Sequence, residues 1–291
     1  MKNIVKVAGI QFDSKQGEKE TNLSTAIRLV DEVASAQVKI CALPDYFSTG
    51  IPLSKEFVRK WSETIPGETT DKLGEVSKKY GIYLMGGMIE RNGKRYFSTS
   101  PLIGPNGKIL GLYRKVNLFT TEPLNEVGFG LTPGKEHPVF RTDFGVIGML
   151  LQCDIDFPEA AKVLALKGAE VVFWMTTVGY HWADMNYRLC QTYAFTNTMY
   201  MVMVNRTGRV DGYPMPFYGG SCVISPVAEV IASAGTSIGT LYLEGKAVAD
   251  IDLASVRELR KRWKLLERFK RSNTYNELKK AVMEGKKGVN R

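Results

Sequence analysis

One short segment, MLLQCDIDFPE at residues 149–159, carries residue types suited to a covalent active site. Cys153 follows an apolar run and precedes two acids and a proline, which is typical of a nucleophile at the end of a buried strand. Its neighbour Gln152 carries a carboxamide, which forms hydrogen bonds but does not attack carbon near neutral pH. Because adjacent side chains of a strand point to opposite faces, we expect only one of the two to face a ligand, unless a turn or bulge at the strand end breaks the alternation.

The other cysteines and the two histidines form no metal-binding or redox motif. Cys41, Cys190 and Cys222 lie in apolar patterns and are predicted to be core residues. No CxxC spacing occurs, and His137 and His181 are the only histidines. We predict that the protein uses no metal and no cofactor.

The net charge of +9 is concentrated at the C-terminal end of the chain. Residues 255–291 contain 13 Lys/Arg and 4 Asp/Glu, so the rest of the chain is neutral. A neutral body is not typical of a groove that follows nucleic-acid phosphates, and we predict no nucleic-acid partner. We predict one domain at residues 1–255 and a basic C-terminal extension at residues 256–291 that makes an oligomer contact.

The chain also lacks the patterns of exported and membrane proteins. Its first residues, MKNIVKVAGIQF, do not form the continuous apolar core of a signal peptide. No window reaches the ~18 apolar residues that span a bilayer. We therefore expect a cytoplasmic protein without membrane contact.

The hydrophobic periodicity predicts strands that alternate with helices. Strands are expected at residues 5–12, 39–44, 82–90, 94–103, 144–152, 171–177 and 200–205, and helices near 23–34, 69–81, 158–170 and 185–198. Three later segments, 220–226, 229–235 and 246–253, are predicted to form a closing meander. This alternation predicts an α/β fold with helices covering the faces of a sheet.

Six ordered blocks of the sequence resemble the nitrilase superfamily of carbon–nitrogen hydrolases. They are LPDYFSTG, YRKVNLF, LTPG, FGVIGMLLQCDIDFPEAAKVLALKGAE, NRTG and YGGSCVISP. The resemblance implies a four-layer α-β-β-α sandwich with a pocket at one end of the strands, assembled as a homodimer or a higher homo-oligomer. It also implies cleavage of nitriles, amides or carbamoyl groups by a Glu–Lys–Cys triad, whose cysteine forms a thioester-type intermediate.

The resemblance assigns the basic and acidic members of the site to three residues. Lys115 in YRKVNLF matches the lysine that stabilises the developing negative charge. Glu126 matches a second glutamate that positions this lysine. Asp45 in PDYFSTG stands where the family has its general-base glutamate, on an arm that is shorter by one C–C bond of ~1.5 Å.

The nucleophile position departs further from the family pattern. Counting forward from Gly145 and backward from Phe157 leads without a gap to Gln152. Cys153 falls where the family often has an aromatic residue. Asp154 matches the family's aspartate and is expected to accept structural hydrogen bonds.

The family lines its substrate pocket with residues that end or follow one of the central strands. Trp174, Thr177, Tyr180 and His181 occupy this region and are candidate substrate-binding residues. Trp182 lies in the same segment, and the expected ligand is a small molecule.

Three hypotheses about function are open at this stage. In the first, the protein lacks the covalent cysteine mechanism and acts on or binds a small amide-, amine-, nitrile- or carboxylate-bearing molecule, or serves as a regulatory or assembly partner. In the second, Cys153 is a displaced nucleophile of an active amidase. In the third, Asp45, Lys115 and Glu126 carry out acid–base chemistry without a covalent step while Gln152 orients the substrate.

Overall fold

Two large β-sheets form the centre of the computed structural model, which describes residues 4–237 and 241–288. The first sheet contains β1 (Ile4–Gln11), β2 (Ile40–Ala42), β3 (Tyr83–Met85), β4 (Met88–Asn92), β5 (Arg95–Ile103), β6 (Ile109–Arg114) and β15 (Gly245–Asp252). Its order is β15-β1-β2-β3-β5-β4, with β6 beside β5.

The second sheet includes the strand that ends directly before Gln152, the candidate nucleophile position. It contains β7 (Val139–Arg141), β8 (Val146–Leu151), β9 (Val171–Thr176), β10 (Tyr200–Asn205), β13 (Cys222–Ile224) and β14 (Val230–Ser233). The order is β14-β13-β10-β9-β8-β7, and β8, β9 and β10 are parallel. A separate short pair is formed by β11 (Thr207–Gly208) and β12 (Phe217–Tyr218).

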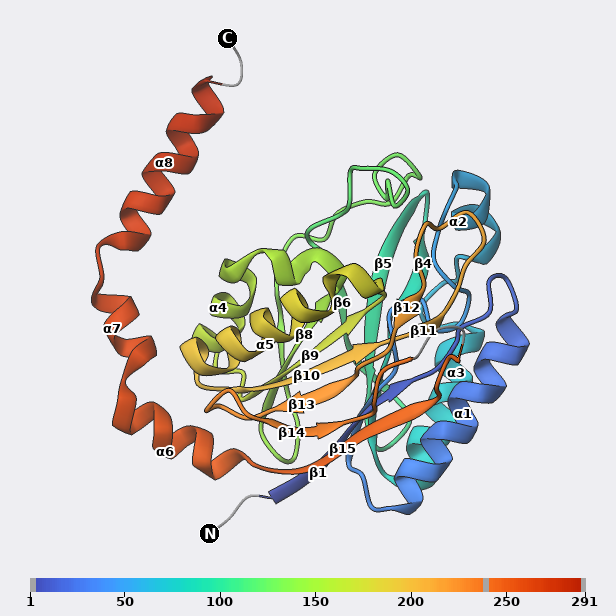
Figure 1. The fold of residues 1–291 in the computed structure, drawn as a ribbon, viewed down its shortest axis with the longest axis horizontal. Coiled ribbons are helices and arrows are strands. Elements are labelled where there is room, and N and C mark those ends of the chain that lie inside the picture. The colour runs from blue at the N-terminus through green and yellow to red at the C-terminus, as the bar shows by residue number, and fades with distance from the viewer. Residues whose placement is uncertain (1–3, 238–240, 289–291) are drawn as a thin grey trace.

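Helices cover the outer face of each sheet, so the molecule is a four-layer α-β-β-α sandwich (Figure 1). The first sheet is covered by α1 (Lys19–Ser35) and α3 (Glu68–Tyr80), and the second by α4 (Pro158–Leu166) and α5 (Ala183–Asn197). The short helix α2 (Lys55–Trp61) packs at one end of the first sheet. The predicted fold class is confirmed.

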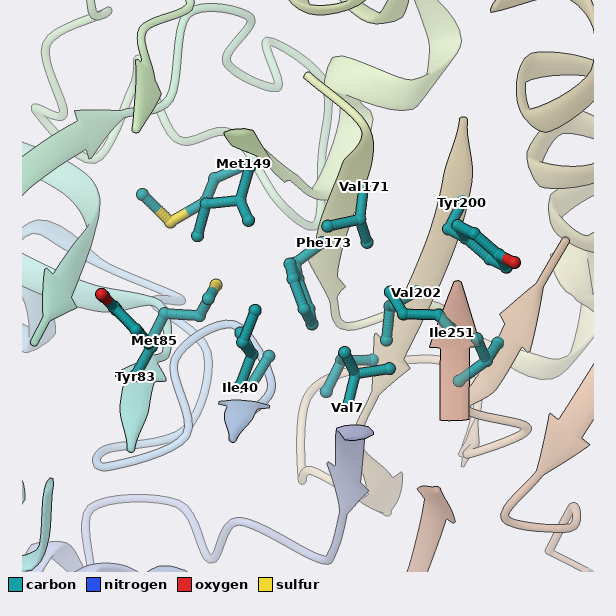
Figure 2. Packing of buried hydrophobic residues seen from close by; sticks show 14 of the residues in the cluster. Val7, Ile40, Tyr83, Met85, Met149, Val171, Phe173, Tyr200, Val202 and Ile251 are labelled. Carbon is teal, nitrogen blue, oxygen red and sulfur yellow. The ribbon is translucent and has the colours of Figure 1, made fainter. Parts of the chain in front are cut away.

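The strands alternate their side chains between the two layers of core, as their period of two requires. In β1, Val5 and Val7 face the space between the sheets, whereas Ala8 and Ile10 face α1. Figure 2 shows side chains of the first sheet meeting Met149, Phe173 and Val202 of the second. This apolar centre holds the two sheets together, because burying apolar surface stabilises by roughly 25 cal/mol per Å².

Two features of the strands differ from the expected pattern. The single strand expected at residues 82–90 is divided into β3 and β4 at Gly86 and Gly87. A Cβ atom at Gly87 would collide with the Asp45 carboxylate, so the absence of a side chain there leaves room for this acid. The prediction of a closing meander is wrong for its last strand. β13 and β14 belong to the second sheet, but β15 belongs to the first sheet, where it pairs antiparallel with β1.

The C-terminal residues form α6 (Leu253–Trp263), α7 (Leu265–Arg271) and α8 (Thr274–Gly288), which follow one another along one edge of the molecule (Figure 1). The predicted domain boundary at residue 255 falls inside α6. Trp263 packs on Phe195 of α5 with 5.3 Å between ring centroids, and Lys162 of α4 lies over Phe269 of α7. Within the described ranges, no helix is both long and apolar enough to cross a bilayer.

Candidate functional site

A fully buried ion pair lies at the centre of the predicted site. Lys115 directly follows β6, and its Nζ atom donates to Glu126 Oε1 at 2.9 Å and to Oε2 at 2.7 Å. Glu126 also accepts from Tyr46 Oη at 2.7 Å and from the Phe119 backbone N–H at 2.9 Å. Burial by itself would lower the pKa of Lys115, but the Glu126 carboxylate more than offsets this and the pKa lies above its usual value.

Asp45 lies beside this pair without bonding to it. Its Oδ1 atom accepts from the Tyr46 backbone N–H at 3.0 Å. Its Oδ2 atom is buried and has no hydrogen-bond partner in the described part of the chain. Burial raises the pKa of Asp45 to about 8, although the charge of Lys115 acts in the opposite direction. Near neutral pH this carboxyl group is therefore largely protonated.

Gln152 is the side chain that contacts Lys115 from the second sheet. It is the first residue of the 3-10 helix η1 (Gln152–Asp156), and Lys115 Nζ donates to its Oε1 atom at 3.0 Å. Its Nε2 atom donates to Thr177 Oγ1, and Trp174 Nε1 donates to its backbone carbonyl at 2.7 Å. The φ angle of Gln152 is +41°, in the left-handed region that few residues with a side chain adopt. Such strained positions cluster at functional sites.

The neighbouring residues Cys153 and Asp154 make different contacts. Cys153 Sγ donates to the Asn117 backbone carbonyl at 2.9 Å, and burial raises the pKa of this thiol to about 12 despite the nearby Lys115. Asp154 accepts from Tyr113 Oη at 2.5 Å and from the backbone N–H groups of Asn117 and Leu151. Asp154 thus makes the structural hydrogen bonds that the sequence indicated.

A cavity of about 680 Å³ opens in front of Gln152 and Cys153, and both residues line it. The expectation that only one of them faces the ligand side is wrong, because β8 ends at Leu151 and the 3-10 turn interrupts the alternation of side chains. Asp45, Lys115 and Glu126 do not line the cavity. Gln152 is thus the member of the cluster that bonds to Lys115 and also reaches the cavity.

The remaining candidates divide into two groups. Trp174 and Thr177 line the cavity. Tyr180 and His181 do not, and Tyr180 is 60% exposed, because the chain turns outward in η2 (Tyr180–Trp182). Trp182 from the same turn does line it.

Several cavity residues have no motif that would have indicated them in the sequence. Helix α5 contributes Met185, Asn186 and Leu189, and two loops contribute residues 121–124 and 213–215. The α5 residues have one signal, which is that α5 is the first α-helix after β9, the strand that ends at the cavity, whereas the two loops have none. In the described ranges, no group of His, Cys, Asp and Glu residues is arranged to hold a metal ion.

The fold and this arrangement correspond to a known family. The carbon–nitrogen hydrolase pattern matches residues 6–261, and the chain therefore belongs to this family. It is 33% identical to omega-amidase NIT2-B of Xenopus laevis over 267 residues, covering 88% of this chain and 92% of the relative. It is 34% identical to a nitrilase of Pyrococcus abyssi over 260 residues, covering 88% and 93%.

A solved structure gives the same assignment. Nit3 of Saccharomyces cerevisiae, a member of branch 10 of the nitrilase superfamily, superimposes with a TM-score of 0.77 at 26% identity. The match covers 89% of this chain and 93% of Nit3.

Proposed function

We propose that this protein binds a small amide-, amine- or nitrile-type molecule in the cavity and forms no thioester at position 152. The observation that carries the proposal is the 3.0 Å hydrogen bond from Lys115 Nζ to Gln152 Oε1. It supports a carboxamide standing beside the lysine, where the family pattern has its cysteine. A carboxamide offers a ligand hydrogen bonds but no nucleophile.

The state of Cys153 supports the same conclusion. The thiolate is the nucleophilic form, and a thiol with a pKa of about 12 is almost wholly protonated near neutral pH. The Cys153 Sγ atom already donates to the Asn117 carbonyl, so the thiol is held as a donor. The name of the Xenopus relative, an omega-amidase, supports amides as the ligand class.

The test combines ligand binding with an assay for ammonia release. A library of small amides is titrated into the full-length protein by calorimetry, and each binder is incubated with the protein for ammonia detection. We expect binding without ammonia release above the buffer rate. Ammonia release with enzyme-like turnover would contradict the proposal, and Cys153→Ala and Lys115→Ala would then locate the reactive group.

A second experiment asks whether the pocket can regain covalent chemistry. The double variant Gln152→Cys with Asp45→Glu restores the residue types of the family triad. We expect it to release ammonia from amides that the wild type only binds. The single variant Gln152→Cys is the matched control, and it should be weaker because the Asp45 carboxyl lies on the shorter arm.

We also propose that the chain assembles as a homodimer or a higher homo-oligomer. Exposed apolar side chains on α8, Tyr275, Leu278, Val282 and Met283, support this proposal because their spacing places them along one side of the helix. Light scattering after gel filtration tests it at micromolar concentration. A strict monomer would contradict it.

A further inference from the structure

The charged side chains that line the cavity are all acidic. They are Glu122, from the loop between β6 and β7, and Asp156, the last residue of η1. No lysine, arginine or histidine of the described residues lines the cavity. This is opposite to the net charge of +9 of the whole chain. The cavity wall therefore offers no cationic side chain that could pair with an anionic group of a ligand.

The buried charged residues behind Gln152 do not change the negative charge of the cavity wall. Lys115 is neutralised by Glu126 at 2.7 Å, and Asp45, with its pKa raised to about 8, is largely uncharged near neutral pH. The field that reaches the cavity is thus set by the acids on its wall. Both acids are exposed, so water and salt screen part of this field, and its effect on a cation is strongest close to the carboxylates.

Asp156 is the better placed of the two acids. It is exposed to solvent and forms no salt bridge among the described residues, whereas Glu122 accepts a hydrogen bond from Asn125 Nδ2 at 3.2 Å. Partial burial raises the pKa of Asp156, and the charge of Asp154 adds to this, although Lys115 acts in the opposite direction. A bound cation would stabilise this carboxylate.

Aromatic rings around the same space suit a cation as well. Trp182, which is 51% exposed, and Tyr213 both line the cavity. The faces of tryptophan and tyrosine rings attract ammonium groups, and most strongly where water is excluded.

One buried polar atom provides an independent sign of a ligand. Thr176 Oγ1 belongs to a cavity-lining residue that is 0% exposed, and this atom has no hydrogen-bond partner in the described part of the chain. The Asn186 amide, also on the cavity wall, interacts with Tyr218. An unpaired buried polar atom costs about 1–3 kcal/mol. A ligand with an amide group can satisfy the Thr176 hydroxyl, since an amide both donates and accepts hydrogen bonds.

We propose that the cavity selects a small amide that also carries a protonated amine, with the amide near Gln152 and Thr176 and the amine at Asp156. This inference rests on the proposed function. Gln152 and Asp156 are the two ends of η1, which at ~2.0 Å per residue separates them by about 8 Å. A linear aminoamide of about five carbons can bridge two groups at this separation, because each bond adds ~1.5 Å at most.

The experiment compares four probes of nearly equal length by calorimetry on the full-length protein. They are 5-aminopentanamide, the neutral pentanamide, the anionic glutaric acid monoamide and pentylamine, which lacks the amide. We expect 5-aminopentanamide to bind at least about tenfold more tightly than pentanamide, and the anionic probe to bind most weakly. Asp156→Asn should remove this tenfold advantage and leave the affinity for pentanamide within about twofold, which also verifies that the variant is folded.

A matched control removes the same charge outside the cavity. Asp184 begins α5, forms an exposed salt bridge with Arg188 at 2.9 Å and does not line the cavity. Asp184→Asn is expected to keep the full preference for 5-aminopentanamide. A loss of preference in this control would contradict a local role of Asp156.

The failure of this inference differs from the failure of the proposed function. If pentanamide binds but the amine confers no advantage, or if the anionic probe binds most tightly, the selection for a cation is wrong and the binding of amides stands. If pentylamine binds and none of the amides does, binding of amides is wrong and the inference fails with it. If no probe binds, both are contradicted.

Discussion

The Lys115–Glu126 pair and the wall of the adjacent cavity differ in how their polar atoms are satisfied. Around the pair, Lys115 Nζ has three acceptors, and both Glu126 oxygens have a second donor. On the cavity wall, the buried Thr176 Oγ1 has no partner and the exposed Asp156 carboxylate forms no salt bridge among the described residues. The pair is complete in the free protein, whereas the wall lacks the groups that a ligand would supply.

This difference separates the contribution of the site to folding from its contribution to ligand binding. A buried charge must be paired to be tolerated, so the pair is required for the fold whether or not the protein binds anything. An unpaired buried polar atom on the wall costs the free protein about 1–3 kcal/mol, and it favours a molecule that satisfies it. Asp45 lies between these cases, because it is buried with one oxygen bonded and the other without a partner.

The largest effect is expected from breaking the ion pair. Glu126→Gln leaves Lys115 buried without a counter-charge. Its amide nitrogen would face either the Phe119 N–H, which can only donate, or Tyr46 Oη, whose hydroxyl would have to turn from donor to acceptor. We expect a loss of about 3–5 kcal/mol in the free energy of unfolding, measured with urea at pH 7. Asp184→Asn, which breaks an exposed pair, should change stability by less than about 0.5 kcal/mol.

A loss below about 1 kcal/mol in Glu126→Gln would contradict the view that the pair belongs to the fold. In that case the ion pair would tolerate substitution as well as the cavity wall does, and the distinction between the two regions would be wrong.

Asp45 should give the next largest effect, and it depends on pH. Its pKa of about 8 in the folded protein lies above the unfolded value of 3.8, so the folded state holds the proton more tightly. This contribution to stability is fully present below pH 4 and is lost as the pH rises toward 8. Asp45→Asn carries no ionisable group and should lack this loss.

The measurement is the urea-unfolding free energy of both proteins from pH 4 to pH 9. The advantage of Asp45→Asn should grow across this window to on the order of a few kcal/mol and then stay constant above pH 8. A constant difference between the two proteins at every pH would show that Asp45 is ionised throughout and bonded in a way that this structure does not contain.

Much of the fold follows from local patterns in the sequence. The apolar runs that become β8, β9 and β10 lie on parallel strands buried on both faces, where such runs are expected. Gly81 ends α3 with φ at +62°, as a C-terminal glycine does. The antiparallel pairing of β15 with β1 was missed, because it joins the two ends of the domain and no local signal records it.

The candidate site was less predictable than the fold. The register of Gln152 was found because ungapped motifs flank it on both sides, and the structure places its amide against Lys115. That Cys153 also lines the cavity depends on the 3-10 turn, which no alternation pattern indicates. Asn186 and residues 213–215 reach the cavity through tertiary packing alone.

A smaller effect is expected from the contact that holds the Gln152 backbone. Trp174 Nε1 donates to the Gln152 carbonyl at 2.7 Å, and Trp174→Phe removes this donor and leaves a small void. We expect a loss of about 1–3 kcal/mol in unfolding free energy by urea, since a buried carbonyl loses its partner. Trp174→Phe should also weaken the binding of pentanamide, because the Gln152 amide would be less well fixed. Loss of stability with unchanged affinity would contradict this positioning role.

The smallest effect is expected at Cys153, whose side chain is small and has one hydrogen bond. Cys153→Ala should lower the unfolding free energy by about 1 kcal/mol, because it removes a buried sulfur and its bond to the Asn117 carbonyl. Alkylation by iodoacetamide, followed by mass mapping, tests the same residue in the wild type. With a thiol pKa of about 12, Cys153 should react at least about 100-fold more slowly at pH 7.5 than it does in the urea-unfolded chain. Faster labelling in the folded protein would reveal an activated thiol on the cavity wall, and it would contradict the proposal that the protein lacks the covalent cysteine mechanism.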